Sequence, residues 1–94
     1  MPIPTLVAYR TKCLQRMYAS GGFEFWVTWD VSKGANEAKV QDALETFVRP
    51  LRTVDNLEQT TRALHGWMQP QVPGLDHVGV RDQFTEVVVR TEVR

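Results

Sequence analysis

The spacing of apolar residues changes twice along this 94-residue chain, and this change limits the possible folds more than any other feature. Between residues 23 and 31 apolar side chains stand at every second position, which is the period of a β-strand. Between residues 36 and 69 they recur at every third or fourth position, the period of an amphipathic helix. Alternation returns between residues 86 and 93. The sequence therefore predicts one α+β domain, residues 1–94, in which two helices separate two sets of strands.

The first set is predicted to be a hairpin. Residues 5–17 alternate loosely, and Ala19-Ser20-Gly21-Gly22 is the clearest turn signal in the chain. Residues 23–31 form the strongest strand signal, because aromatic and β-branched side chains suit a pleated surface. The two strands and the turn between them favour antiparallel pairing.

Two helices are predicted near residues 36–49 and 55–69. Pro50 should end the first, since the residue before a proline is pushed out of the helical region. Asp55-Asn56-Leu57-Glu58 fits a capping box, with Asp55 as the cap of the second. The buried stripe of the second helix is expected at positions 57, 60, 61, 64, 67 and 68.

Short strands at residues 78–80 and 86–93 complete the order ββααββ. The simplest arrangement is a four-stranded antiparallel sheet with both helices on one face. The nearest rival is a ferredoxin-like βαββαβ order. It needs a strand at residues 51–54, and the capping box that follows argues against one.

Composition excludes several classes of protein. Eleven basic residues balance eleven acidic ones, so a strongly basic nucleic-acid binder is disfavoured. No apolar run approaches the ~20 residues of a membrane span, and we expect no signal peptide. One cysteine cannot form an internal disulfide. We expect a small soluble protein inside the cell, in the cytoplasm.

The residues that commonly carry catalysis are sparse. His65, His77 and Cys13 show none of the spacings of a metal site, so we expect no metal and no cofactor. Cys13, Asp76 and His77 contain the groups of a nucleophile, an orienting carboxylate and a base. Cys13 is equally typical of a small hydrophobic residue on the core face of the first strand, and we favour that interpretation. The sequence therefore predicts no catalytic residues.

Trp26 is the most informative single residue, because alternation points it away from the face that the helices cover. Apolar residues of the same parity occur in the other strands, and an exposed patch of this kind is typical of an interface. The alternative is a bulge that slips the register and turns Trp26 into the core. The predicted interface residues are Leu6, Leu14, Trp26, Phe84 and Val88.

A basic strand face offers a second kind of surface. Arg10, Lys12 and Arg16 share one side of the first strand, where they could contact phosphates or carboxylates. The zero net charge favours an ordinary solvated face. A nucleic-acid-binding subunit is therefore the least favoured of three functional hypotheses.

The second half of the chain resembles the tunnelling-fold family of 6-pyruvoyl-tetrahydropterin synthase. The similarity lies in short segments: Thr53, Asn56-Leu57, Pro73-Gly74-Leu75 and Val78-Gly79-Val80. Asp82 stands where that family has its pterin-anchoring glutamate, followed by Gln83 instead of threonine. The zinc-binding histidines of the family are missing, with Ser20-Gly21-Gly22 near their place, and Leu75-Asp76-His77 follows the second helix instead of separating the two. The resemblance implies the scaffold and its assembly of sheets into a barrel.

These observations favour a non-catalytic interaction subunit, which associates with itself or with a larger complex through the helix-free face or an edge of its sheet. The alternative is a pterin- or purine-binding protein or enzyme of the tunnelling fold, with Asp82 or Glu86 anchoring the ring. Absence of a nucleophile or metal pattern places the interaction subunit first.

Overall fold

A computed structural model describes residues 5–9, 12–19, 22–51, 54–83 and 85–91; of the first two ranges it describes the backbone alone. Three strands come first, then a short 3-10 helix and two α-helices, then two more strands. The elements are β1 (Thr5–Tyr9), β2 (Lys12–Ala19), β3 (Phe23–Asp30), η1 (Val31–Lys33), α1 (Glu37–Val48), α2 (Leu57–Met68), β4 (Leu75–Asp82) and β5 (Val88–Arg90).

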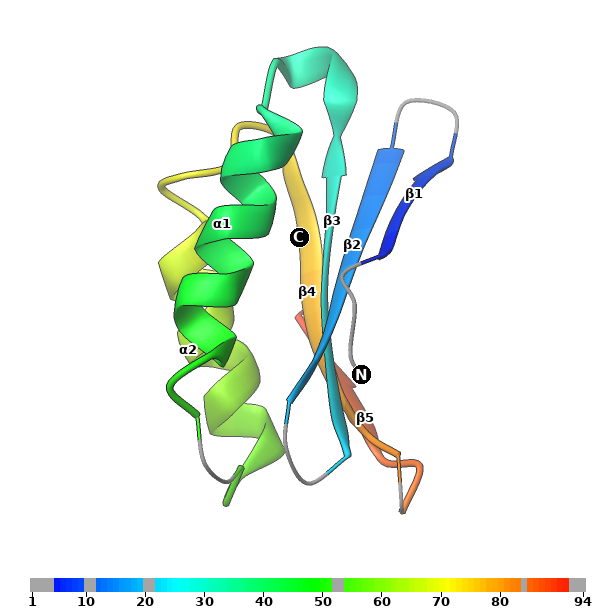
Figure 1. The fold of residues 1–94 in the computed structure, drawn as a ribbon, viewed down its shortest axis with the longest axis vertical. Coiled ribbons are helices and arrows are strands. Elements are labelled where there is room, and N and C mark those ends of the chain that lie inside the picture. The colour runs from blue at the N-terminus through cyan, green and yellow to red at the C-terminus, as the bar shows by residue number, and fades with distance from the viewer. Residues whose placement is uncertain (1–4, 10–11, 20–21, 52–53, 84, 92–94) are drawn as a thin grey trace.

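The strands form an antiparallel sheet in the order β1-β2-β3-β4-β5, and both helices lie against one face of it (Figure 1). The α+β class, the two helices and the antiparallel sheet confirm the sequence prediction. The predicted count of four strands is wrong, because residues 5–17 form parts of two strands that pair with Tyr9 opposite Lys12. No glycine or proline marks that reversal, so nothing in the sequence indicated it.

The core lies between the sheet and the helices. Phe25, Val27 and Trp29 alternate along β3 and are fully buried, and Val78 and Val80 of β4 stand beside them. The helices cover them with a second layer of apolar side chains. Its buried members are Val40, Ala43, Leu44, Val48, Leu64 and Met68.

The helix ends are capped by asparagines. Asn36 Oδ1 accepts hydrogen bonds from the amides of Ala38 and Lys39 at 2.9 and 3.2 Å, and α1 ends at Val48, as Pro50 predicted. At α2 the cap is Asn56 in place of the predicted Asp55; its Oδ1 accepts from the amide of Gln59 at 3.0 Å. Both residue types are good caps, so the sequence did not separate these neighbours.

Trp67 departs from the predicted buried stripe of α2. It is 40% exposed, and its indole Nε1–H donates to the carbonyl of Ala43 at 2.9 Å. The side chain therefore lies along the contact between the two helices, and one of its edges faces water.

Candidate functional site

A β-bulge gives the helix-free face of the sheet its polar cluster. Along β3 and β4 the register pairs Thr28 with His77 but Trp29 with Leu75, so Asp76 is an extra residue on β4. Successive strand residues normally point to opposite faces, and a bulge breaks that rule. Asp76 and His77 can therefore both reach Thr28.

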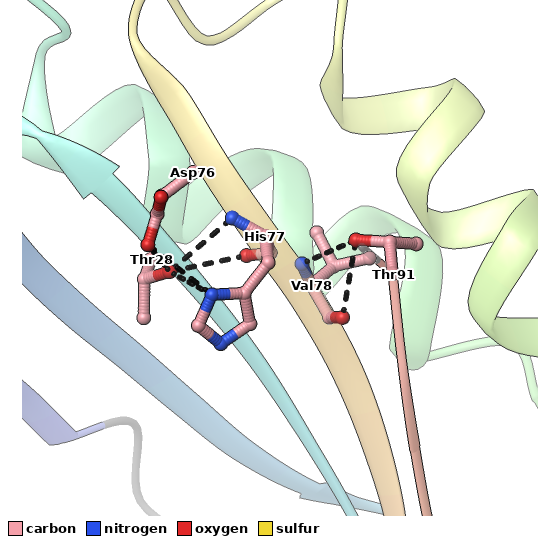
Figure 2. A network of polar contacts seen from close by, with 5 residues as sticks. All are labelled: Thr28, Asp76, His77, Val78 and Thr91. Carbon is pink, nitrogen blue, oxygen red and sulfur yellow. Dashed lines mark hydrogen bonds and ion pairs between the residues drawn. The ribbon is translucent and has the colours of Figure 1, made fainter. Parts of the chain in front are cut away.

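Three side chains meet at this bulge (Figure 2). His77 Nδ1 lies 3.0 Å from Thr28 Oγ1 and 3.2 Å from Asp76 Oδ2, and the Thr28 hydroxyl lies 3.2 Å from the same Asp76 oxygen. The side chains of His77 and Asp76 are 21% and 28% exposed, whereas Thr28 is nearly buried at 8%. The cluster is thus held firmly and is still reached by solvent.

The arrangement orients an imidazole and does not form a catalytic relay. In a relay, the carboxylate binds one ring nitrogen and the nucleophile lies at the other. Here the hydroxyl and the carboxylate gather at the same nitrogen, Nδ1 of His77. Cys13 stands opposite Trp29 in the register, while His77 stands opposite Thr28; the side chain of Cys13 is outside the described residues.

Trp26 lies beside this cluster and across Gly79. The two residues are partners in the register, and a methyl group added at Gly79 would stand 2.1 Å from Cζ2 of the indole. The indole also meets the His77 ring edge to face, with centroids 6.4 Å apart. Trp26 is on the helix-free side of β3, where its own sheet covers part of its surface. The side chain is therefore half-buried and not fully exposed.

A groove lies on the other side of the molecule, between α2 and β5. Its volume is about 640 Å³. α2 contributes one wall and β5 the other, and Gly66 in the wall has no atom within 4 Å of where a side chain would begin. The lining residues are Glu58, Thr61, Arg62, His65, Gly66, Val89, Arg90 and Thr91.

β5 is the last strand of the described sheet, so one side of it is an edge. The carbonyl of Val87 accepts from Asp82 and the amide of Thr91 donates to Val78, so the odd-numbered residues face β4. Val88 is even-numbered, so its backbone amide and carbonyl point away from β4, toward the open edge. Val87 and Val88 are also 49% and 50% exposed, as two of the three large exposed hydrophobic residues in the described part of the chain.

The other predicted interface residues are only partly described. Leu6 stands opposite Gln15 and Leu14 opposite Thr28, but their side chains, and all of Phe84, lie outside the described residues. The same holds for Arg10 and for the side chains of Lys12 and Arg16. The basic face on the first strands therefore stays a prediction.

Asp82 and Glu86, the predicted ring anchors, lie in one turn. The amide of Glu86 donates to the carbonyl of Asp82 at 2.7 Å, and Asp82 Oδ1 accepts from the amide of Thr85 at 3.3 Å. Glu86 has a φ of 62° and its carboxylate contacts Arg81 at 3.4 Å. Neither residue lines the groove.

Sequence reasoning grouped Asp76 and His77 but with Cys13 in place of Thr28, and it missed the groove. The cluster depends on a one-residue bulge, and the groove on how far α2 extends over β5, and neither leaves a periodic signal. Among the described residues there is no group of three His, Cys, Asp or Glu side chains able to hold a metal ion, and no helix long and apolar enough to cross a membrane. Comparison of the chain with family models, with curated proteins and with solved structures finds no match.

Proposed function

We propose that this protein is a non-catalytic assembly subunit that associates with a second copy of itself through the edge of β5. The observation that carries the proposal is the combination of an outward-facing backbone at Val88 with two half-exposed valines, Val87 and Val88. Unpaired strand edges with apolar side chains are sites where another chain pairs.

Two copies of β5 are complementary to each other in an antiparallel pair. When the pair is centred on Val88, the amide of each Val88 donates to the carbonyl of the other. A two-fold axis at Val88 brings the same surface of the two copies together, as in most homodimers. The result is one continuous antiparallel sheet formed by two chains.

The expected gain in free energy is moderate. Covering the exposed halves of Val87 and Val88 contributes about 1 kcal/mol for each valine. β5 has only three residues, and a short edge strand is one of the ways in which proteins limit such pairing. We therefore expect a reversible dimer with a dissociation constant in the micromolar range or above.

The helix-free face is the other surface that the sequence suggested. Trp26 is half-buried over Gly79, so it offers less apolar area than a fully exposed tryptophan would. This favours the β5 edge as the principal contact. For a pterin or purine site no described feature adds support, because Asp82 and Glu86 make contacts within their own turn.

Light scattering over a range of protein concentrations tests the proposal. The wild type should change from the mass of one chain to the mass of two as concentration rises. Val88→Lys should remain a monomer, because the two lysines would meet at the centre of the pair. Ala38→Lys, at an exposed position of α1, is the matched control and should dimerise as the wild type does. A wild type that stays monomeric at millimolar concentration would refute the proposal.

A further inference from the structure

We infer that the groove between α2 and β5 is closed in this dimer by α2 of the second copy, with Glu58 of each copy paired to Arg62 of the other. The inference rests on the proposed pairing of β5 edges. It adds a helix–helix layer to the strand–strand contact, and it assigns a role to the charged side of α2.

The position of α2 brings two copies of this helix close together. α2 packs on both β4 and β5, and the Thr61 hydroxyl lies 3.5 Å from the carbonyl oxygen of Val89, so the helix lies next to the edge of the sheet. Paired strands are about 4.8 Å apart. The Val89 carbonyl points toward β4, so α2 lies over the gap between β4 and β5, about one strand spacing from the two-fold axis. Two such helices are about 10 Å apart, close to the usual packing distance of 8–10 Å.

The same contact sets which residues meet. α2 runs antiparallel to β4, the strand that follows it, and β4 is antiparallel to β5. α2 and β5 therefore run in the same direction (Figure 1). A two-fold axis at Val88 lies one strand residue, or about 3.3 Å, before Val89. Because a helix rises about 1.5 Å per residue, this distance corresponds to about two residues of α2. The axis therefore passes beside α2 about two residues before Thr61, at the level of Gln59 and Thr60. Around such an axis Glu58 of one copy faces Arg62 of the other.

The charges of these residues suit that arrangement. Glu58 and Arg62 form an ion pair within the helix, and their side chains are 62% and 72% exposed. Both line the groove. Around the two-fold axis the four charges alternate in sign, so each carboxylate has an arginine on its own helix and one on the facing helix. Such a network is worth more than an isolated surface pair.

The groove leaves space beside Gly66 for a second chain. A glycine inside a helix costs about 1 kcal/mol relative to alanine. Gly66 lines the groove, and apart from its chain neighbours and its own helix backbone no atom lies within 4 Å of the position that a Cβ would take there. Packing against other parts of this chain therefore does not account for the glycine. With the axis near position 60, the residues that lead into α2 of the second copy, Val54 to Asn56, lie opposite Gly66.

A mixing experiment with two charge variants tests the inference. In Glu58→Arg alone, four arginines surround the axis of the dimer; in Arg62→Glu alone, four glutamates do. Each variant should therefore dissociate about tenfold more readily than the wild type, measured by sedimentation at low salt. An equimolar mixture should form heterodimers in preference to either homodimer, because every facing pair is then of opposite charge. Native mass spectrometry separates the three species by mass.

Glu45 and Arg49 provide the matched control, since they form the same kind of ion pair one turn apart on α1. Glu45→Arg and Arg49→Glu should dimerise as the wild type does and should mix statistically. If Val88→Lys abolishes the dimer but the Glu58 and Arg62 variants behave like the wild type, the helix contact is wrong and the edge contact stands. A wild type without any dimer overturns both.

Discussion

The two faces of the β3–β4 pair are built from the same strands but are covered in different ways. On the helix-covered face, Phe25, Val27 and Trp29 are fully buried by side chains from α1 and α2. On the opposite face no described helix lies, and Trp26 and Thr28 are covered largely by their neighbours within the sheet. The helix-covered face is buried by a second layer of secondary structure. On the helix-free face, the cover of Trp26 and Thr28 depends on Gly79 and on the bulge at Asp76.

This difference shows why an outward tryptophan is not always an exposed one. Gly79 has no side chain, so the indole of Trp26 can occupy the space beside β4 where a Cβ would stand. The bulge at Asp76 brings a carboxylate to the same side as His77 and Thr28. Where β3 and β4 form it, the helix-free face therefore needs little cover from a partner. Among the described side chains, the large exposed hydrophobic residues are Trp67, Val87 and Val88, and the two valines lie at the edge of β5.

The largest expected effect distinguishes the two tryptophans of β3, Trp26 and Trp29. Trp29→Ala should lower the free energy of unfolding by about 4 kcal/mol, because it leaves a cavity in the core. Trp26→Ala should cost about half as much, since its indole is only half-buried. Chemical denaturation of both variants measures the difference. Equal losses would show that the helix-free face is buried as deeply as the core.

The contact between Trp26 and Gly79 is tested by a double-mutant cycle. Gly79→Ala should destabilise the fold by about 2 kcal/mol, because the new methyl group overlaps the indole. In the background of Trp26→Ala the same substitution should cost little, since the overlapping ring is absent. Additive effects in the denaturation curves would show that the two residues do not touch.

These comparisons also separate what the sequence predicts from what it does not. Alternation placed Trp29 toward the helices and Trp26 away from them, and the period of 3.6 located both helices. Alternation could not show the bulge at Asp76, because one extra residue changes the strand register without changing the pattern of residue types. The reversal between β1 and β2 was missed because Tyr9 and Lys12 enclose no glycine or proline.

The candidate site was less predictable than the fold. Alternation predicted Val88 as an interface residue, and its side chain is half-exposed in β5. The groove beside β5 was not predicted, because it depends on how far α2 extends over the edge. Glu58 and Arg62 differ in no way from an ordinary i, i+4 pair in the sequence.

The polar cluster on the helix-free face has a smaller expected effect. Thr28→Val keeps the shape of the side chain but removes the hydroxyl that bonds to Asp76 and lies beside His77. We expect a loss of about 1 kcal/mol in the free energy of unfolding, since the exposed portions of both partners can turn to water. Thr46→Val on α1, whose hydroxyl also donates one hydrogen bond, is the control for losing a hydroxyl. Equal losses would mean that the cluster adds nothing beyond one bond.

The smallest expected effect is a gain. Gly66→Ala should raise the free energy of unfolding by up to about 1 kcal/mol, because alanine favours the helix and its methyl group meets only open space. Thermal unfolding at low protein concentration, where the monomer dominates, should show a midpoint higher by a few degrees. A lower midpoint would show that the groove is already filled in the monomer.

Amide hydrogen exchange at Val88 tests the central claim, that two copies pair through β5, most directly. The amide of Val88 points away from β4, so it should exchange quickly at low protein concentration and more slowly as concentration rises. The amide of Thr91 is an internal control, because it donates to Val78 within one chain at 3.0 Å and should respond much less. An exchange rate at Val88 that stays constant from micromolar to millimolar protein would contradict the account.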